Sequence, residues 1–467
     1  MNAGAFKLLF LAMMGAGIPV AIAMAGAALV YVMATGNPPP YVVIHRMVGG
    51  IDSFPLLAVP FFILAGNLMN SAGITTRIYN FALALVGWLR GGLGHVNIVG
   101  SVVFAGMSGT AIADAAGLGT IEIKAMREHG YDAEFAVGVT AASATLGPII
   151  PPSLPFVIYG MFANVSVGAL FLAGLMPGLV MTVMMMLTVA WFAHRKGWGR
   201  DVAWQWPRVR KALLELALVV GLPTALWLVA RTGVDMVVAV PVALAVLLAA
   251  DWKLRFNAVL PIMTPVLLIG GMTTGLFTAT EGAIAACAWA LFLGGVWYRT
   301  LNWKMFVKAS MDTVETTSTV LLIVAAASIF GWMLTATRTT EAIAGWILTF
   351  ADAPWKFLLL ANALMLFVGC FLEPTAAITI LVPILLPIVR HLGIDPVHFG
   401  LVMVLNLMIG LLHPPMGLVL FVLARVAKLS VERTTMAILP WLVPLLLSLA
   451  LVTFIPAISL WLPRLLS

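Results

Sequence analysis

The chain has 467 residues, of which 62% are hydrophobic and only 9% are charged. This composition excludes a soluble globular protein of this size, because apolar runs of about 20 residues recur and each is long enough to cross a hydrocarbon core. The net charge of +7 comes from Lys and Arg between the runs, so it reports membrane orientation and does not indicate nucleic-acid binding. The sequence therefore predicts an all-α polytopic membrane protein.

A long apolar segment at residues 8–35 is the first predicted span. It is too long for a signal-peptide core and lacks a convincing cleavage site, so we expect a retained helix. Residues 75–90 have an apolar middle of about 12 residues, too short to cross, which favours an interfacial helix, and 339–351 is its counterpart. Further spans are expected at 53–72, 168–193, 212–231, 233–250, 256–275, 279–298, 312–334 and 434–463.

Four segments depart from simple spans. Residues 92–128 and 355–392 each resemble two short helical arms joined by a small-residue turn. We expect re-entrant hairpins there, which enter and leave the membrane on one side. The segments 132–165 and 396–426 are apolar but are interrupted by glycine and paired prolines, so we expect broken helices.

The two halves of the chain repeat each other. Gly66, Thr75 and Gly130 recur at an almost constant offset as Gly331, Thr339 and Gly393. The sequence thus predicts a first repeat at 1–200, linking spans at 201–275 and a second repeat at 276–467. The basic loop at 194–211 places one side in the cytoplasm. An odd number of crossings between 8–35 and its mate 279–298 then makes the repeats inverted, with the first hairpin open to the cytoplasm and the second to the outside.

A hairpin tip that meets a helix break exposes backbone oxygens in mid-membrane, where such groups are tolerated only in a protein-lined cavity. Broken-helix carbonyls are hard ligands suited to Na⁺, and half-helix N-termini favour anions. We expect Na⁺ ligands at both tips and both breaks: Ser108, Gly109, Gly147 and Ile150 for the first site, and Thr375, Gly410 and His413 for the second.

Two carboxylates stand beside these turns. Asp114 lies one helical turn past Thr110, and an intramembrane carboxylate is functional by default, although a structural cap is the alternative. Glu373 sits at the second tip, where an N-cap before Pro374 is an equally good interpretation. Glu281 is more simply a cap, and His413 more simply a packed polar group. No Ser/His/Asp set, HExxH or phosphate loop is present, so we expect neither an enzyme nor an ATP-driven pump.

Four runs carry a family resemblance: GGLGHVNIVGSVVFAGMSGTAIADAAGLGTI (91–121), TAASATLGPIIPPSLPFVIYG (140–160), GLFTATEGAIAA (275–286) and PTAAITILVPILLPIVRHLGIDPVHFG (374–400). The chain resembles, over nearly its whole length, the DctM-like large membrane subunit of a TRAP (tripartite ATP-independent periplasmic) transporter. The resemblance implies a multi-pass protein of the bacterial inner membrane. It also implies Na⁺-coupled uptake of an organic acid by an elevator, in which a transport domain carrying the hairpins moves against a scaffold.

The resemblance implies partners and roles as well. The partners are a periplasmic substrate-binding protein and a small four-helix membrane subunit. Substrate contacts would fall on Thr110, Asp114 and Glu373. A stand-alone ion-coupled carboxylate carrier is the alternative, and a membrane enzyme using Asp114 and Glu373 as an acid/base pair is a third interpretation. The sequence does not name the acid, because in this family the binding protein selects it.

The chain departs from the family pattern at four places. Thr110 replaces a usual serine, Glu373 a usual aspartate, and His413 a usual threonine. Two additional apolar segments at about 212–253 intervene where family members usually pass straight to LPIMTPVLLIGG (260–271). Because two spans are added, the sidedness of everything downstream is preserved.

Overall fold

The computed structural model describes residues 3–36, 38–231, 236–254, 256, 258–273, 276–413 and 417–466. Within these ranges all regular elements are helices and no strand occurs. Six helical segments are long and apolar enough to cross a membrane, and a seventh is obtained if α17 (Thr339–Phe350) and α18 (Pro354–Gly369), bent by 118°, are taken as one. The predicted all-α, multi-pass architecture is confirmed.

The first repeat contains most of the short helices. They are α1 (Ala3–Gly15), α2 (Val20–Thr35), α3 (Tyr41–Ile51), η1 (Phe54–Leu57), α4 (Ala58–Ser71), α5 (Ile74–Val86), α6 (Gly92–Ser108), α7 (Ala111–Ala116), α8 (Leu118–Glu128), α9 (Ala133–Ala144), α10 (Leu154–Ala163) and α11 (Val167–Lys196). The linking region holds α12 (Trp206–Arg231), α13 (Met236–Leu254) and α14 (Val259–Thr273).

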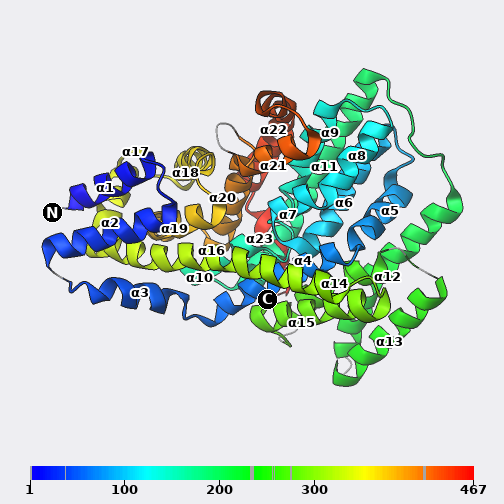
Figure 1. The fold of residues 1–467 in the computed structure, drawn as a ribbon, viewed down its shortest axis with the longest axis horizontal. Helices are drawn as coiled ribbons and strands as arrows, with labels where there is room; N and C mark the ends of the chain where they lie inside the picture. The colour runs from blue at the N-terminus through cyan, green and yellow to red at the C-terminus, as the bar shows by residue number, and fades with distance from the viewer. Residues whose placement is uncertain are drawn as a thin grey trace.

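The second repeat contains both long and short helices. They are α15 (Ala279–Leu291) with its π-helical continuation η2 (Phe292–Trp297), α16 (Trp303–Ala336), α17, α18, α19 (Pro374–His391), α20 (Pro396–Gly410), α21 (Leu418–Ala427), α22 (Val431–Phe454) and α23 (Ala457–Leu466). α16 runs along the length of the molecule and packs against α2, α3, α4 and α19 (Figure 1). It begins well before the span predicted at 312–334 because Asn302 caps it, accepting from the Met305 amide at 2.9 Å.

The single span predicted at 8–35 is wrong, because two helices occupy it. Gly17 adopts the left-handed region at φ +79°, and Pro19 has no amide with which to continue the preceding helix. The helices α1 and α2 fold back on each other, with the Phe6 and Tyr31 rings 5.5 Å apart. The predicted number of membrane crossings was counted from one helix at 8–35, so that count no longer holds. The side of the membrane to which each hairpin opens therefore stays a prediction.

The hairpins are formed by α6 with α7–α8 and by α18 with α19. The first differs from prediction, since its second arm is kinked at Gly117. A Cβ there would lie 2.8 Å from the Ala113 carbonyl oxygen and 3.1 Å from the Asn70 side chain, so only glycine fits. The broken helices are also found, as α9–α10 and α20–α21, although Pro414 and Pro415 lie outside the described residues.

The hairpins and broken helices interlock across the two repeats. The hairpin arm α7 packs against α9 of its own repeat and against α21 of the other. In the same way, α19 packs against α20 of its own repeat and against α10 of the other. Each hairpin is therefore held between the first half of one broken helix and the second half of the other.

The segments at 212–231 and 236–253 lie in α12 and α13, at one end of the molecule (Figure 1), and their status as an insertion stays a prediction. They are tied to the rest of the chain by buried carboxylates. Glu215 accepts from the Ala258 amide at 3.0 Å, before α14, and Asp251 accepts from the Trp297 indole at 2.9 Å. α12 also packs against α5 and α14.

Candidate functional site

The first hairpin tip touches the break of the first broken helix. Gly109 has φ +63°, and a Cβ on it would lie 2.8 Å from the Pro152 carbonyl oxygen. A Cβ on Gly147 would lie 2.9 Å from the carbonyl oxygen of Thr110. Glycine is therefore needed on both sides of the contact, and the structure brings together the tip and break residues that the sequence paired.

The hydroxyl groups of Ser108 and Thr110 at this tip differ in their hydrogen bonding. The Thr110 hydroxyl accepts from the Ala113 amide at 3.3 Å and caps α7. Ser108 is 5% exposed, and its hydroxyl has no hydrogen-bond partner among the described residues. A buried hydroxyl without a partner is costly unless a ligand satisfies it, so Ser108 is the strongest ligand candidate at this tip.

The break itself is internally braced. The Ser153 hydroxyl donates to the Pro148 carbonyl at 2.5 Å and accepts from the Phe156 amide at 3.3 Å, capping α10. Ile150 is buried, and its side chain fills the space over Gly178 of α11. These two hydrogen bonds fix the backbone of the break against the start of α10.

Asp114 lies in a buried position on α7. It is 1% exposed, and neither carboxylate oxygen has a hydrogen-bond partner within the described part of the chain. Because Thr110 performs the capping of α7, the structural-cap interpretation of Asp114 is not what the structure shows. Ser101 of α6 is a polar side chain close enough to act on its carboxylate.

A buried polar network lies behind Asp114, and the sequence analysis missed it. The Asn97 amide donates to Glu122 Oε2 at 2.6 Å and to the Thr140 hydroxyl at 2.8 Å, and its oxygen accepts from Ser143 at 2.8 Å. Ser101 donates to Ser143 at 3.0 Å. The network joins both arms of the first hairpin to α9. The available signal was the spacing of Asn97 and Ser101, four residues apart on one helical face.

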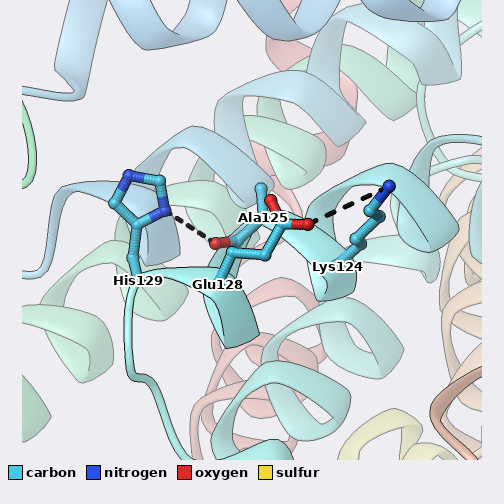
Figure 2. A network of polar contacts seen from close by, with 4 residues as sticks. All are labelled: Lys124, Ala125, Glu128 and His129. Carbon is cyan, nitrogen blue, oxygen red and sulfur yellow. Dashed lines mark hydrogen bonds and ion pairs between the residues drawn. The ribbon is translucent and has the colours of Figure 1, made fainter.

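The C-terminal end of α8 carries charged side chains that are exposed to solvent. Lys124 and Glu128 are exposed and 3.9 Å apart, and the His129 ring nitrogen Nδ1 lies 2.9 Å from the Ala125 carbonyl oxygen (Figure 2). An exposed pair of this kind contributes little to stability. Glu122, two residues before Lys124, is only 2% exposed, so one helix carries both a solvated charged end and a buried carboxylate.

The second tip is built around Glu373. Its Oε2 accepts from the Ala376 amide at 3.3 Å, and its Oε1 accepts from the Thr375 hydroxyl at 2.9 Å. Glu373 is therefore the N-cap of α19, as one of the two interpretations predicted. Glu373 is half-buried as a residue and Thr375 is buried, and each carboxylate oxygen of Glu373 already accepts one hydrogen bond.

The second break contacts its hairpin through a glycine pair. A Cβ on Gly410 would lie 2.6 Å from the Gly369 carbonyl carbon, so the end of α18 rests directly on the end of α20. His413 is exposed, and its Nδ1 lies 3.4 Å from the Cys370 sulfur. Cys370 is buried and lies beside this predicted site residue.

Two hairpins whose tips meet two broken helices, with buried polar side chains at the junctions, define a membrane transport protein. The family described as "Tripartite ATP-independent periplasmic transporter, DctM component" matches residues 8–458. The chain belongs to this family, and it is a multi-pass protein of the bacterial inner membrane. The resemblance seen in the sequence is confirmed.

The curated relatives are similar along nearly the whole chain. The sialic acid TRAP transporter large permease SiaM of Vibrio cholerae is 43% identical, covering 98% of this chain and 97% of its own. The permease SiaT of Haemophilus influenzae, described for sialic acid, is 39% identical over 98% of this chain and 68% of its own. The 2,3-diketo-L-gulonate permease YiaN of Escherichia coli is 32% identical, covering 94% of each.

Solved structures share the fold. The YdaH transporter of Alcanivorax borkumensis superposes with a TM-score of 0.60 at 15% identity, over 91% of this chain and 90% of its own. MtrF of Neisseria gonorrhoeae gives a TM-score of 0.56 at 12% identity, over 90% and 85%. At this identity the likeness concerns architecture alone.

Proposed function

We propose that this chain is the permease through which Na⁺ drives the uptake of an organic acid delivered by a periplasmic binding protein, with a small four-helix subunit beside it. The family description makes the chain one component of a tripartite transporter. Relatives are described as permeases for sialic acid, C4-dicarboxylates and 2,3-diketo-L-gulonate. All of these are organic acids, which supports an anionic substrate here.

The observation that carries the proposal is the buried, unpartnered hydroxyl of Ser108 at a tip pressed against a helix break. Na⁺ prefers hard oxygen ligands, and unwound carbonyls with one hydroxyl are a fitting set. Gly109, Gly147 and Ile150 supply backbone oxygens at this junction. The ion would complete the coordination that the protein alone leaves open.

The second ion site is proposed at the Glu373 tip. Thr375 and Gly410 supply a hydroxyl and a backbone oxygen near the glycine contact. His413 is the expected ligand that the geometry supports least, because it is exposed and its Nδ1 is directed to Cys370. A ring nitrogen is also a softer ligand than Na⁺ prefers.

We place the substrate between the two tips, near Thr110, Asp114 and Glu373. The N-termini of α10 and α19 carry partial positive charge that favours an anion. The carboxylates of Asp114 and Glu373 would accept hydrogen bonds from hydroxyl or amide groups of the acid, while bound Na⁺ offsets their charge. The proposal requires no covalent chemistry.

An elevator movement is the mechanism we propose. The interlocked hairpins and broken helices form one packed unit, because α7 contacts α21 and α19 contacts α10. A unit of this kind moves as a whole more readily than in parts. The long helix α16, with α2, α3 and α4 packed on it, is suited to remain fixed as the scaffold.

The test is uptake by the complex reconstituted in proteoliposomes with its cognate binding protein, across a panel of labelled organic acids. We expect uptake of one acid that depends on both the binding protein and an inward Na⁺ gradient. Equal uptake after the Na⁺ gradient is replaced by K⁺ would contradict ion coupling. Uptake without the binding protein would instead identify a stand-alone carrier.

A further inference from the structure

A cavity of about 360 Å³ lies between α5 and the start of α12, away from the hairpin site. The lining residues come from two stretches of chain: Asn80, Leu83, Ala84 and Trp88 from one side, and Val202, Ala203, Gln205, Arg208, Val209 and Lys211 from the other. The second stretch belongs to the basic loop that the sequence places in the cytoplasm and to the helix that follows it.

The lining combines positive charge with apolar surface. Among the described residues that line the cavity, the charged side chains are Arg208 and Lys211, and both are cationic. Leu83, Ala84 and Val209 supply an apolar wall. A ligand that fits must therefore carry negative charge at one end and hydrocarbon at the other.

Aromatic residues place the cavity at the membrane boundary. Trp88 packs edge-on against Trp204 with ring centroids 4.5 Å apart, and Trp204 stacks on Trp206 at 6.2 Å. Trp204 and Trp206 are 45% and 56% exposed. Exposed tryptophans collect at the depth of lipid headgroups.

Hydrocarbon contact begins immediately beyond the tryptophans. Leu213 and Leu214, about two turns into α12, are 43% and 48% exposed. An apolar helix face of this kind is what acyl chains cover. The sequence along α12 thus passes from basic and aromatic to aliphatic in the order in which a phospholipid passes from headgroup to tail.

We propose that this cavity binds the headgroup of an anionic phospholipid, with its phosphate against Arg208 and its acyl chains along α12. Basic pockets between helices on the cytoplasmic side are a known mode of recognition of acidic headgroups. Charge complementarity and the apolar wall favour a lipid over free phosphate, which would leave the wall without a partner. The lipid fills the junction between α5 and α12.

Arg208 is the side chain through which charge recognition is best tested. Lys211 also acts on the Asp251 carboxylate, so its substitution would disturb α13 as well. Arg208→Gln removes charge and keeps most of the side-chain length. Ala84→Phe leaves all charges in place and puts a ring into the cavity, which reduces the space for a headgroup. One variant therefore weakens lipid binding by removing charge, and the other by removing space.

The experiment is native mass spectrometry of the full-length chain, purified and titrated with phosphatidylglycerol or phosphatidylcholine. We expect one phosphatidylglycerol retained per chain and no equivalent retention of phosphatidylcholine. Arg208→Gln should weaken retention about fivefold, as expected for the loss of one cationic contact worth about 1 kcal/mol. Ala84→Phe should abolish it.

The controls repeat each change away from the cavity. Lys304→Gln removes an exposed cation at the start of α16, and Ala217→Phe adds a ring at an exposed position of α12. Both variants should retain the lipid. Wild-type retention in Ala84→Phe, or equal retention of phosphatidylcholine, would overturn the proposal. So would competition by inorganic phosphate at the concentration at which phosphatidylglycerol binds. Thermal melting shows whether Arg208→Gln or Ala84→Phe is misfolded. If one of them is, lipid retention by the other variant tests the proposal.

Discussion

Ser108 shows what a single residue contributes at the first tip. Its side chain is enclosed, yet its hydroxyl has no hydrogen-bond partner among the described residues, while the neighbouring Thr110 hydroxyl is engaged in capping. The two polar residues on either side of Gly109 therefore differ: Thr110 caps α7, and Ser108 is the residue that we propose as a ligand.

We expect Ser108→Ala to reduce Na⁺-dependent uptake by about tenfold or more, since the loss of one ligand worth about 1.4 kcal/mol weakens ion binding tenfold. Protein stability should be unchanged or slightly higher, because the variant removes a buried polar atom without a partner. Uptake as a function of Na⁺ concentration is the measurement. Thr120→Ala, which alters an exposed hydroxyl of the same hairpin, is the control. An unaltered Na⁺ dependence in Ser108→Ala would remove this residue from the site.

Glu373 has two separable roles, and two substitutions distinguish them. Glu373→Ala removes the α19 cap, at a cost of about 1 kcal/mol, together with the charge. Glu373→Gln keeps an oxygen for the Ala376 amide, removes the charge, and replaces the oxygen that accepts from Thr375 by an NH2 group that can donate to the same hydroxyl. We expect both variants to depress uptake, and only Glu373→Ala to lower the melting temperature clearly. If Glu373→Gln transported at the wild-type rate, the carboxylate would be a cap and nothing more.

The Asn97 network makes a prediction about stability. Asn97→Ala leaves three buried partners on α8 and α9 without their hydrogen bonds to this side chain, so we expect a loss of about 1–3 kcal/mol in the free energy of unfolding. Asn97→Ala combined with Glu122→Gln should lose less than the sum of the single variants, since the residues are coupled. Thermal unfolding of the purified chain measures both. Lys124→Ala, at the exposed end of α8, should change stability little; additive losses would show that the network is not coupled.

At the scale of elements, glycine decides where helices meet. The contact between Gly369 and Gly410 brings the backbones of α18 and α20 together, as small residues do in membrane helix packing. The same principle applies at Gly109 and Gly147 in the first half. The two junctions are alike in using backbone approach and different in the side chains that surround it.

Gly410→Ala tests this element contact. The added methyl group would lie 2.6 Å from the Gly369 backbone, so α18 must shift, and we expect loss of uptake with lowered thermal stability. Gly345→Ala in α17 is the matched control, since nothing lies within 4 Å of its added methyl group. Alanine in a helix is otherwise slightly favourable. Wild-type behaviour of Gly410→Ala would show that the junction has room to adjust.

How far the sequence predicted these elements depended on the residues involved. Paired prolines and glycines located both broken helices, and the turns at Ser108 and Glu373 located both hairpin tips, because such residues act through local backbone geometry. The same local signals at Gly17 and Pro19 were present but were not used, so 8–35 was taken as one helix. At Gly117 the Asn70 side chain lies where a Cβ would be placed, and this is a tertiary contact that the local sequence does not reveal.

The candidate site was predictable in part for the same reason. At the first junction the predicted tip and break do lie in contact, through Gly109, Thr110 and Gly147. At the second junction Gly410 contacts Gly369 at the end of α18, so its pairing with Glu373 and Thr375 stays a prediction. Glu122 was not found, because its neighbours Lys124, Arg127 and Glu128 suggest a solvated helix end. Its burial depends on which face of α8 turns toward α6 and α9, and the pattern of charges along that helix does not reveal it.

At the scale of the whole molecule, the repeats are joined by exchange of halves. α21 covers the first hairpin and α10 covers the second, so neither repeat has a complete site of its own. Substitutions in one half are therefore expected to affect the geometry of both junctions. The two halves of the chain have similar sequences, but their packing makes them one structural unit.

This exchange has a consequence for biosynthesis. The ribosome makes α7 long before α21, so the polar interior of the first hairpin must wait in the bilayer until nearly the whole chain has emerged. Contacts between distant segments form slowly and leave intermediates exposed. The nascent protein therefore passes through a prolonged stage in which its first hairpin lacks its final cover, and this stage is where membrane quality-control proteases would find it most vulnerable.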